Sequence, residues 1–299
     1  MTTMNKIGYI IVYSVLWLIA LIPLRILLSI SWPLYFILYY IIQYRKKVVF
    51  TNLKNSFPEK PDKEIQRIAK RFYLHLCDIF IETFYSLNMG IKEALRRYTV
   101  SNIELMNELK TREENLIFIS NHYANWEWAN IPWTKTESTY SGVYKPLSNK
   151  IFDRLMITIR EKHGSITVPM KNTLRFIFEM NKKNKHYMLY LISDQRPMKS
   201  EIQYWSTFLN QDTPFLTGPE KLAKKFNIPV VFVDVNKIKR GYYEVTYRII
   251  TDNPKETKEF EITEKYIRLI EEQIKRKPEY YLWSHKRWKH KRVPMDVEP

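Results

Sequence analysis

The chain has 299 residues, a length that fits one large α/β domain or two modest ones. Hydrophobic residues make up 45%, which is enough for a packed core and argues against a disordered chain. The formal net charge of +17 indicates an anionic partner, and nucleic acid, anionic lipid and acidic proteins all satisfy it. A single cysteine, Cys77, excludes an internal disulfide, and we expect it in a buried helix.

The N-terminal segment has the composition of a membrane anchor. The first 44 residues contain no Asp or Glu, and residues 7–24 form an uncharged run of 18. A second apolar stretch, residues 26–42, ends among tyrosines and is followed at once by Arg45-Lys46-Lys47. By the positive-inside rule, the rest of the chain lies on the cytoplasmic side. We therefore predict a hydrophobic membrane anchor over residues 1–44 and a second domain over residues 45–299.

Two other interpretations of this segment compete with a spanning helix. A hydrophobic hairpin or helix could lie in the membrane interface without crossing it. A cleaved signal peptide would need small residues at its cleavage site, but the residues after the apolar core are the bulky Ile22-Pro23-Leu24-Arg25. The first of these alternatives stays open.

The remaining pattern predicts an α/β fold. A helix begins near Asp62, a candidate N-cap, with Ile65, Ile68, Phe72, Leu76, Ile79 and Phe80 at helical spacing. Apolar strands follow at residues 116–120, 140–144, 187–192 and 228–233, and a half-exposed strand at 242–250 follows a turn at 239–241. Helices at 174–180 and 219–226 separate some of these strands, and a further helix at 263–277 follows the last one. We predict a mainly parallel central sheet flanked by helices, with an N-terminal anchoring helix or hairpin.

A histidine and a glutamate follow the first of these strands. His122 comes two residues after it, where sites form in open α/β sheets, and Glu127 comes five residues later. Five residues on one helix are about 140° apart, so the two side chains can meet only if His122 lies outside the helix of Glu127. Asn121 or Asn125 could cap that helix. We expect the Glu127 carboxylate to reach back to the imidazole.

This pair suits acyl transfer. A neutral imidazole can remove a proton from an attacking alcohol or amine, and a carboxylate on its other nitrogen fixes the tautomer. No Ser or Cys nearby offers itself as a nucleophile, so direct transfer is simpler than an acyl-enzyme. The six histidines show no metal-ligand spacing, and H-x4-E lacks the H-E-x-x-H pattern of zinc enzymes. We therefore expect neither a metal nor a cofactor.

The motif and five further blocks resemble one family. Asn121 to Glu127 is similar to the H-x4-E motif of the glycerolipid acyltransferase superfamily, and more narrowly to the bacterial lipid A late acyltransferases (the lauroyl/myristoyl acyltransferase family). The resemblance runs in order over most of the chain from about residue 45. The other blocks are residues 48–59, residues 144–150 continuing to Arg160 and Gly164, residues 193–195, residues 217–223 and residues 278–289.

The resemblance implies an inner-membrane enzyme whose catalytic domain spans residues 45–299. It would move a fatty acyl group from an acyl thioester, carried by acyl carrier protein or CoA, to a hydroxyl of a glycolipid such as a lipid A precursor. His122 would be the general base and Glu127 its orienting partner. The implied substrate-site residues are Asn121, Lys145, Arg160, Asp194, Gln195 and Gly218, with Arg160 on a phosphate or an oxyanion.

Departures from the family pattern leave the acceptor open. Gln195 is followed by Arg196-Pro197 in place of an acidic residue and Gly, and Phe208-Leu209-Asn210 replaces Phe-Phe-Gly. A lysophospholipid or an amino-acid lipid therefore remains an alternative acceptor. Two other classes also remain: a lipid hydrolase or thioesterase, and a catalytically silent membrane-associated binding protein that keeps the fold.

The excess of positive charge fits these partners. Acyl carrier protein is acidic, and basic residues near a membrane favour anionic lipid. Residues 286–292 hold five Lys or Arg in seven, and we expect Trp288 at the membrane interface and His285 and His290 on the surface. The sequence shows no recognised nucleic-acid-binding motif, so no nucleic acid partner is expected.

Overall fold

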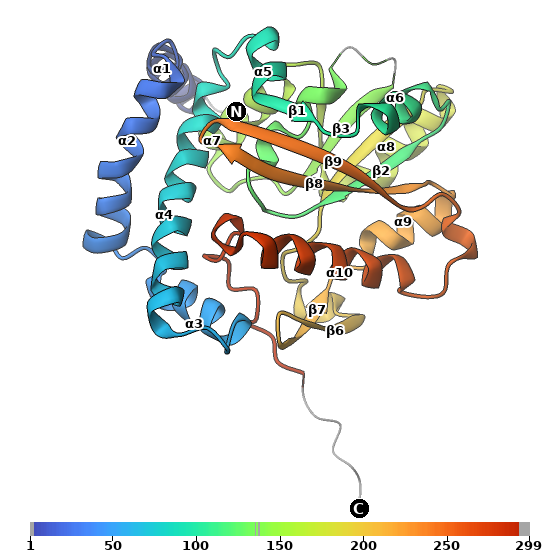
Figure 1. Cartoon of the computed structure of the whole chain (residues 1–299). Coiled ribbons are helices and arrows are strands. Elements are labelled where there is room, and N and C mark those ends of the chain that lie inside the picture. Colours follow the sequence, from blue (N-terminus) through green and yellow to red (C-terminus); the bar gives the residue numbers. More distant parts are fainter. Residues whose placement is uncertain (1–2, 135, 137, 293–299) are drawn as a thin grey trace, which may run out of the picture.

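A seven-stranded sheet forms the centre of the molecule, with strand order β1-β9-β8-β2-β5-β3-β4 (Figure 1). The computed structural model describes residues 3–134, 136 and 138–292, so residues 1–2 and 293–299 of the two predicted domains lie outside the described part. A separate hairpin pairs β6 with β7. The strands are β1 (Tyr98–Val100), β2 (Leu116–Ser120), β3 (Thr139–Tyr144), β4 (Ile166–Pro169), β5 (Tyr187–Ile192), β6 (Tyr204–Phe208), β7 (Gln211–Phe215), β8 (Val230–Lys239) and β9 (Tyr242–Thr251).

Helices surround this sheet. Figure 1 shows α9 and α10 along one side of it, α5 and α6 on the other, and α4 upright beside the end of the β8–β9 hairpin. The helices are α1 (Thr3–Ile19), α2 (Leu24–Phe36) with a π-helical continuation η1 (Ile37–Ile41), α3 (Lys46–Ser56), α4 (Asp62–Tyr85), α5 (Ile91–Arg97), α6 (Ile103–Thr111), α7 (Lys150–Glu161), α8 (Thr173–Lys182), α9 (Gly218–Phe226) and α10 (Glu261–Arg276).

The predicted mainly parallel sheet is confirmed. Every residue of β2 is buried, and β2 pairs in parallel with both β5 and β8. Covering helices on both faces explain why its sequence is continuously apolar. β9 pairs antiparallel to β8, after a turn in which Gly241 has a φ of +71°. Buried and half-exposed residues alternate along most of β9, as the sequence predicted.

Two predictions about α4 were wrong. The helix begins at Asp62 itself with Pro61 as its N-cap residue, and the Asp62 carboxylate instead lies 2.8 Å from Lys54 Nζ. Proline suits a helix start because the backbone N–H it lacks would have no helical partner there. Phe80 was placed on the buried face, but 58% of it is exposed. The true buried face continues from Ile79 to Glu82, which is completely buried.

The N-terminal helices pack along the domain. α1 lies against α7 and α2 against α4, and Leu24, Leu27 and Leu28 belong to the main core. The 18 residues Leu24–Ile41 are long and apolar enough to cross a membrane, judged by length and composition, and 28% of this window is buried. The boundary at residue 44 stays a prediction.

Candidate active site

His122 lies at the carboxyl edge of the sheet, in the loop that follows β2. It is outside the short 3-10 helix η2 (Trp126–Trp128) that carries Glu127, as the spacing argument required. The side chain is 19% exposed, and its ring packs edge-on against Trp126 with the centroids 5.2 Å apart. A partly open imidazole at a sheet edge can meet both protein partners and a ligand.

Asp194 is the carboxylate that contacts this imidazole. His122 Nδ1 and Asp194 Oδ1 are 2.7 Å apart, and the Asp194 side chain is only 3% exposed. Sheet register explains the contact, because Ser120 of β2 pairs with Ile192 of β5 and each partner residue follows its strand end by two positions. Burial would raise the pKa of Asp194, but His122 and Arg287 outweigh it and lower that pKa below its usual value. Asp194 is therefore held as a carboxylate.

Glu127 does not contact the imidazole, contrary to the expectation from the sequence. Its two carboxylate oxygens accept from Arg160 Nε at 2.9 Å and Arg160 Nη2 at 2.8 Å, and Trp126 Nε1 adds a third bond of 3.1 Å. The fork geometry of a guanidinium matches a carboxylate, so this pair satisfies Glu127 fully. Burial would raise the pKa of Glu127, but Arg160 outweighs it and the pKa is lowered. Two carboxylates therefore flank the site. Asp194 contacts His122, and Glu127 contacts Arg160.

The C-terminal segment holds the His122 loop through its backbone. The Leu282 N–H donates to the His122 carbonyl at 3.1 Å, and the Ala124 N–H donates to the Tyr280 carbonyl at 3.0 Å. Tyr123 and Tyr281 form an antiparallel bridge between these bonds. Ala124 has a φ of +50°, an uncommon value for a residue with a Cβ, so the loop needs this external support.

The other predicted substrate-site residues lie at different distances from His122. Gln195 Nε2 lies 3.4 Å from His122 Nε2, on the side of the ring away from Asp194. Lys145 is exposed just after β3, and Gly218 is the exposed first residue of α9. Among the described residues, neither of these two makes a hydrogen bond to His122, Glu127 or Asp194. Asn121 is 1% exposed, and neither atom of its buried amide has a hydrogen-bond partner among the described residues, so its role at the site stays a prediction.

Part of the basic tail is inside the molecule, contrary to expectation. Arg287 is 1% exposed and Trp288 is 8% exposed, and Trp288 Nε1 donates to Thr213 at 2.8 Å instead of facing a membrane. His285 was expected on the surface, but burial lowers its pKa to about 4. The charge of Asp194 raises this pKa and that of His122 lowers it, so His285 lies close to the site. In the sequence, residues 286–292 look like one charged surface run. The turns that bury Arg287 and Trp288 depend on tertiary contacts, which the local sequence does not reveal.

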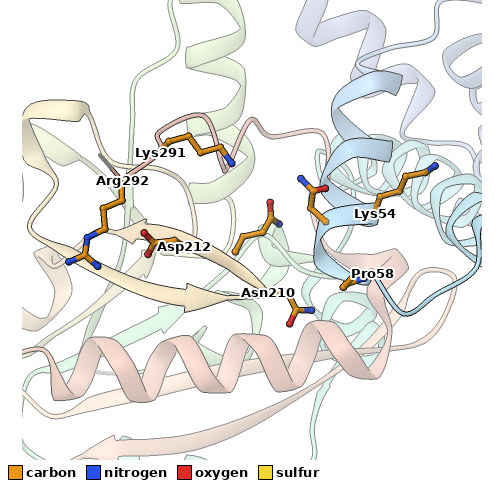
Figure 2. A pocket seen from close by; sticks show the side chains of 8 residues that line it. Lys54, Pro58, Asn210, Asp212, Lys291 and Arg292 are labelled. Atoms are coloured by element: carbon orange, nitrogen blue, oxygen red, sulfur yellow. The ribbon is translucent and has the colours of Figure 1, made fainter. Parts of the chain in front are cut away.

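A wider hollow lies away from these residues. Its volume is about 510 Å³, and it is lined by α3 and the segment just after it, by the β6–β7 hairpin and by the tail: Lys54, Asn55, Pro58, Asn210, Gln211, Asp212, Lys291 and Arg292 (Figure 2). None of the predicted site residues, all of which the structure describes, lines it. Beside Trp126, an apolar cavity of about 10 Å³ has room for about one water molecule, and so it does not hold a fatty acyl chain.

The geometry is a buried carboxylate on an imidazole, at a sheet edge, with a bidentate Glu–Arg pair beside it. The sequence profile of the family described as bacterial lipid A biosynthesis acyltransferase matches residues 2–290. The chain belongs to this family. The enzyme is 22% identical over 290 residues to the lipid A biosynthesis lauroyltransferase of Escherichia coli (strain K12), a match that covers 92% of this chain and 89% of that relative.

A solved structure is also similar to the acyltransferase. The crystal structure of the 1-acyl-sn-glycerophosphate acyltransferase from Thermotoga maritima aligns with 83% of this chain and 93% of its own, at 13% identity and a TM-score of 0.36. A likeness this distant carries no conclusion about function. Membership of the family shows that the enzyme is an acyltransferase that acts on lipid.

Proposed function

We propose that the enzyme moves a fatty acyl group from an acyl thioester to a hydroxyl of a glycolipid such as a lipid A precursor, with His122 as general base. The observation that carries the proposal is the 2.7 Å contact between His122 Nδ1 and the buried Asp194 carboxylate. A carboxylate on Nδ1 selects the tautomer that has its proton there and leaves Nε2 as the basic nitrogen. This assigns the orienting role, given to Glu127 on sequence grounds, to Asp194.

The proposed reaction uses that basic nitrogen. Nε2 takes the proton of the acceptor hydroxyl while the hydroxyl oxygen attacks the thioester carbonyl, and a tetrahedral oxyanion forms. Collapse of this intermediate breaks the carbon–sulfur bond, and the imidazolium returns the proton to the leaving thiolate. Gln195 Nε2 lies 3.4 Å from Nε2 of the base, and in our proposal the acceptor hydroxyl displaces it from this contact.

Glu127 and Arg160 would act as a unit beside the base. Glu127 takes the Nε and Nη2 edge of the guanidinium, and the Arg160 side chain keeps 29% of its surface exposed. No hydrogen bond joins Nη1, on the opposite edge, to another residue of the described part of the chain, so Nη1 can donate to an anionic oxygen. In our proposal Glu127 therefore aims Arg160 at the oxyanion or at a substrate phosphate.

The donor and the location extend the proposal. A net charge of +17 favours an acidic carrier of the acyl group, so we propose acyl carrier protein, with acyl-CoA as the alternative donor. Apolar side chains on the outer faces of α1 and α2, such as Ile10 at 59% and Ile30 at 45% exposure, support attachment to a membrane. We place the site on the cytoplasmic side of the inner membrane, following the basic residues after the second apolar stretch.

The test is acyl transfer by purified enzyme to a lipid A precursor, with acyl-loaded carrier protein as donor. Replacing His122 by Ala should abolish transfer, because the variant lacks the group that takes the acceptor's proton. His186→Ala is the matched control, since His186 is exposed in the segment just before β5. Near-normal turnover by the His122→Ala variant would overturn the assignment of the base.

The same assay separates the remaining candidates. Release of free fatty acid without any acceptor lipid would identify a thioesterase, in which water replaces the hydroxyl. Acylation of a lysophospholipid or an amino-acid lipid in place of the lipid A precursor would change the acceptor alone. An intact protein that consumes no thioester with any lipid extract would support the silent binding protein.

A further inference from the structure

Glu82 is a completely buried carboxylate on the face of α4 that meets the loop of the candidate active site. It accepts three hydrogen bonds from three separate segments. Asn125 Nδ2 donates at 2.8 Å, Tyr243 Oη on β9 at 2.7 Å, and the Gly241 backbone N–H at 3.0 Å. One side chain therefore ties α4, the β8–β9 turn and the loop between His122 and Glu127 together.

Stability alone gives a poor account of this carboxylate. Among the described residues no ion pair is formed by Glu82, since the nearby cation Lys237 bonds instead to Asp78 Oδ2 at 3.1 Å and His75 Nδ1 at 3.0 Å. A buried charge without a paired cation costs free energy, and apolar residues of similar volume are often at least as stable. Burial of this kind is better explained by a requirement to hold a polar group in one orientation.

The polar group in question is the amide of Asn125. Its Nδ2 donates to Glu82, and its Oδ1 accepts the Trp128 N–H at 3.2 Å, so the side chain caps η2, the 3-10 helix that carries Glu127. Four residues after Glu82, at the C-cap of α4, Ser86 Oγ accepts from Trp128 Nε1 at 2.7 Å. Two side chains from this end of α4 therefore hold the helix on either side of Glu127.

The two halves of the site are held by different means. Main-chain bonds to Tyr280 and Leu282 support the loop at His122, and those bonds do not depend on any side chain. The half with Glu127 depends on side chains of α4 and its last turn. Loss of Glu82 should therefore displace Glu127 and the Arg160 that it aims, while it leaves His122 and Asp194 in place.

We propose that Glu82 is a positioning residue of the acyltransferase, which fixes the amide of Asn125 and through it the Glu127–Arg160 pair. This rests on the proposed function of the site. Glu82 touches neither the base nor the reacting atoms, so its effect is on the geometry of the groups that do.

A reciprocal exchange of the two side chains tests this. Asn125→Asp sets a second carboxylate against Glu82, and Glu82→Gln leaves an amide that cannot accept from Asn125, Tyr243 and Gly241 at once. In the double variant, the amide nitrogen of the introduced glutamine can donate to the introduced aspartate and to the Tyr243 oxygen, and its carbonyl can accept the Gly241 N–H.

Each single variant should lower kcat by about tenfold, and the double variant should return to within about threefold of wild type. Steady-state acyl transfer measures both effects. Thr83→Ser is the control, because among the described residues Thr83 Oγ1 donates within its own helix alone, to the Ile79 carbonyl at 2.7 Å.

Amide hydrogen exchange gives a readout that does not need activity. In Asn125→Asp the peptide covering residues 125–130 should exchange faster, the peptide covering residues 280–284 should not change, and the double variant should restore the first. Should the single variants fail to fold, Ser86→Ala provides a milder perturbation of the same helix, for which we expect a smaller fall in kcat and faster exchange in residues 125–130.

The outcomes separate the positioning role from the proposed function. Wild-type enzyme that transfers no acyl group contradicts the proposed function, while the exchange pattern still decides what Glu82 holds. Active wild-type enzyme with unchanged kcat and exchange in the folded single variants, or in Ser86→Ala, overturns the positioning role. A folded double variant that stays as impaired as Asn125→Asp also overturns it, because Asn125 would then act independently of Glu82.

Discussion

Among the individual residues, the central finding is that the imidazole and the glutamate of the H-x4-E motif have separate partners. Asp194 contacts the His122 imidazole, and Arg160 donates hydrogen bonds to Glu127. Both carboxylates are buried and both have a lowered pKa, so each is an anion with a fixed neighbour. The two acids therefore have different predicted effects on the rate.

Asp194→Asn should lower kcat by about 10²- to 10⁴-fold, because the amide no longer holds the tautomer that leaves Nε2 free. Glu127→Gln should act on the Arg160 contact and raise KM or lower kcat by a smaller factor. Steady-state kinetics on both variants measure this, with the surface variant Asp252→Asn as control. The reverse ranking, with Glu127→Gln the more severe, would restore the role that the spacing suggested.

Among the helices and strands, α4 connects the site to the rest of the fold through buried charge. Burial raises the pKa of Glu82 to about 7, and the nearby charge of Asp78 also raises it. The charge of Lys237 and the hydrogen bonds that Glu82 accepts from Tyr243 and Asn125 lower the pKa, but they do not outweigh burial. A carboxyl group with a folded pKa above its ordinary value of 4.5 favours the folded state most when it is protonated. Its contribution to stability is therefore lost as the pH rises from about 4.5 to about 7.

We expect the free energy of unfolding of wild type, measured relative to Glu82→Gln, to fall by about 2 to 3 kcal/mol between pH 5 and pH 8. The glutamine does not titrate, so the comparison cancels the other ionisable groups. Denaturant unfolding of both proteins at a series of pH values provides the measurement. A difference that stays constant over this range would show that Glu82 is ionised at an ordinary pKa.

In the molecule as a whole, the apolar N-terminal helices lie along the domain and expose one face each. The inner residues of α2 belong to the main core, and those of α1 pack in a smaller cluster with Leu155 and Ile159 of α7. Removal of residues 1–44 would therefore damage the fold as well as any attachment. Substitution on the outer faces separates the two effects.

The double variant Ile10→Asp and Ile30→Asp should leave the membrane fraction while it keeps a wild-type melting temperature. Each introduced aspartate should weaken membrane partitioning by about 2 kcal/mol, because a charge does not enter the hydrocarbon region readily. Vesicle flotation measures this, with Leu174→Asp on α8 as an exposed apolar control at 45% exposure. Unchanged flotation of the Ile10/Ile30 variant would show that α1 and α2 are not the attachment surface.

Much of the fold could be read from local pattern. The apolar run of β2, the alternation in β9 and the proline at the start of α9 all predicted elements that the structure contains. The β6–β7 hairpin was missed, since its residues show no clear alternation of apolar and polar side chains. Glu82 was also missed, although an acidic residue three positions after Ile79, on the buried face of α4, was a usable signal.

The ordered blocks that resemble one family were enough to predict a lipid acyltransferase, and the spacing of His122 and Glu127 predicted a histidine outside the helix that carries the glutamate. These are local properties, and they can be read along the chain. The partners of the two side chains depended on the folded structure, which places Asp194 on His122 and Arg160 on Glu127. For His122 and Asp194 the physical reason is strand order. β5 lies beside β2, and Ser120 pairs with Ile192, so the residues two positions beyond each strand end meet although they are far apart in the sequence.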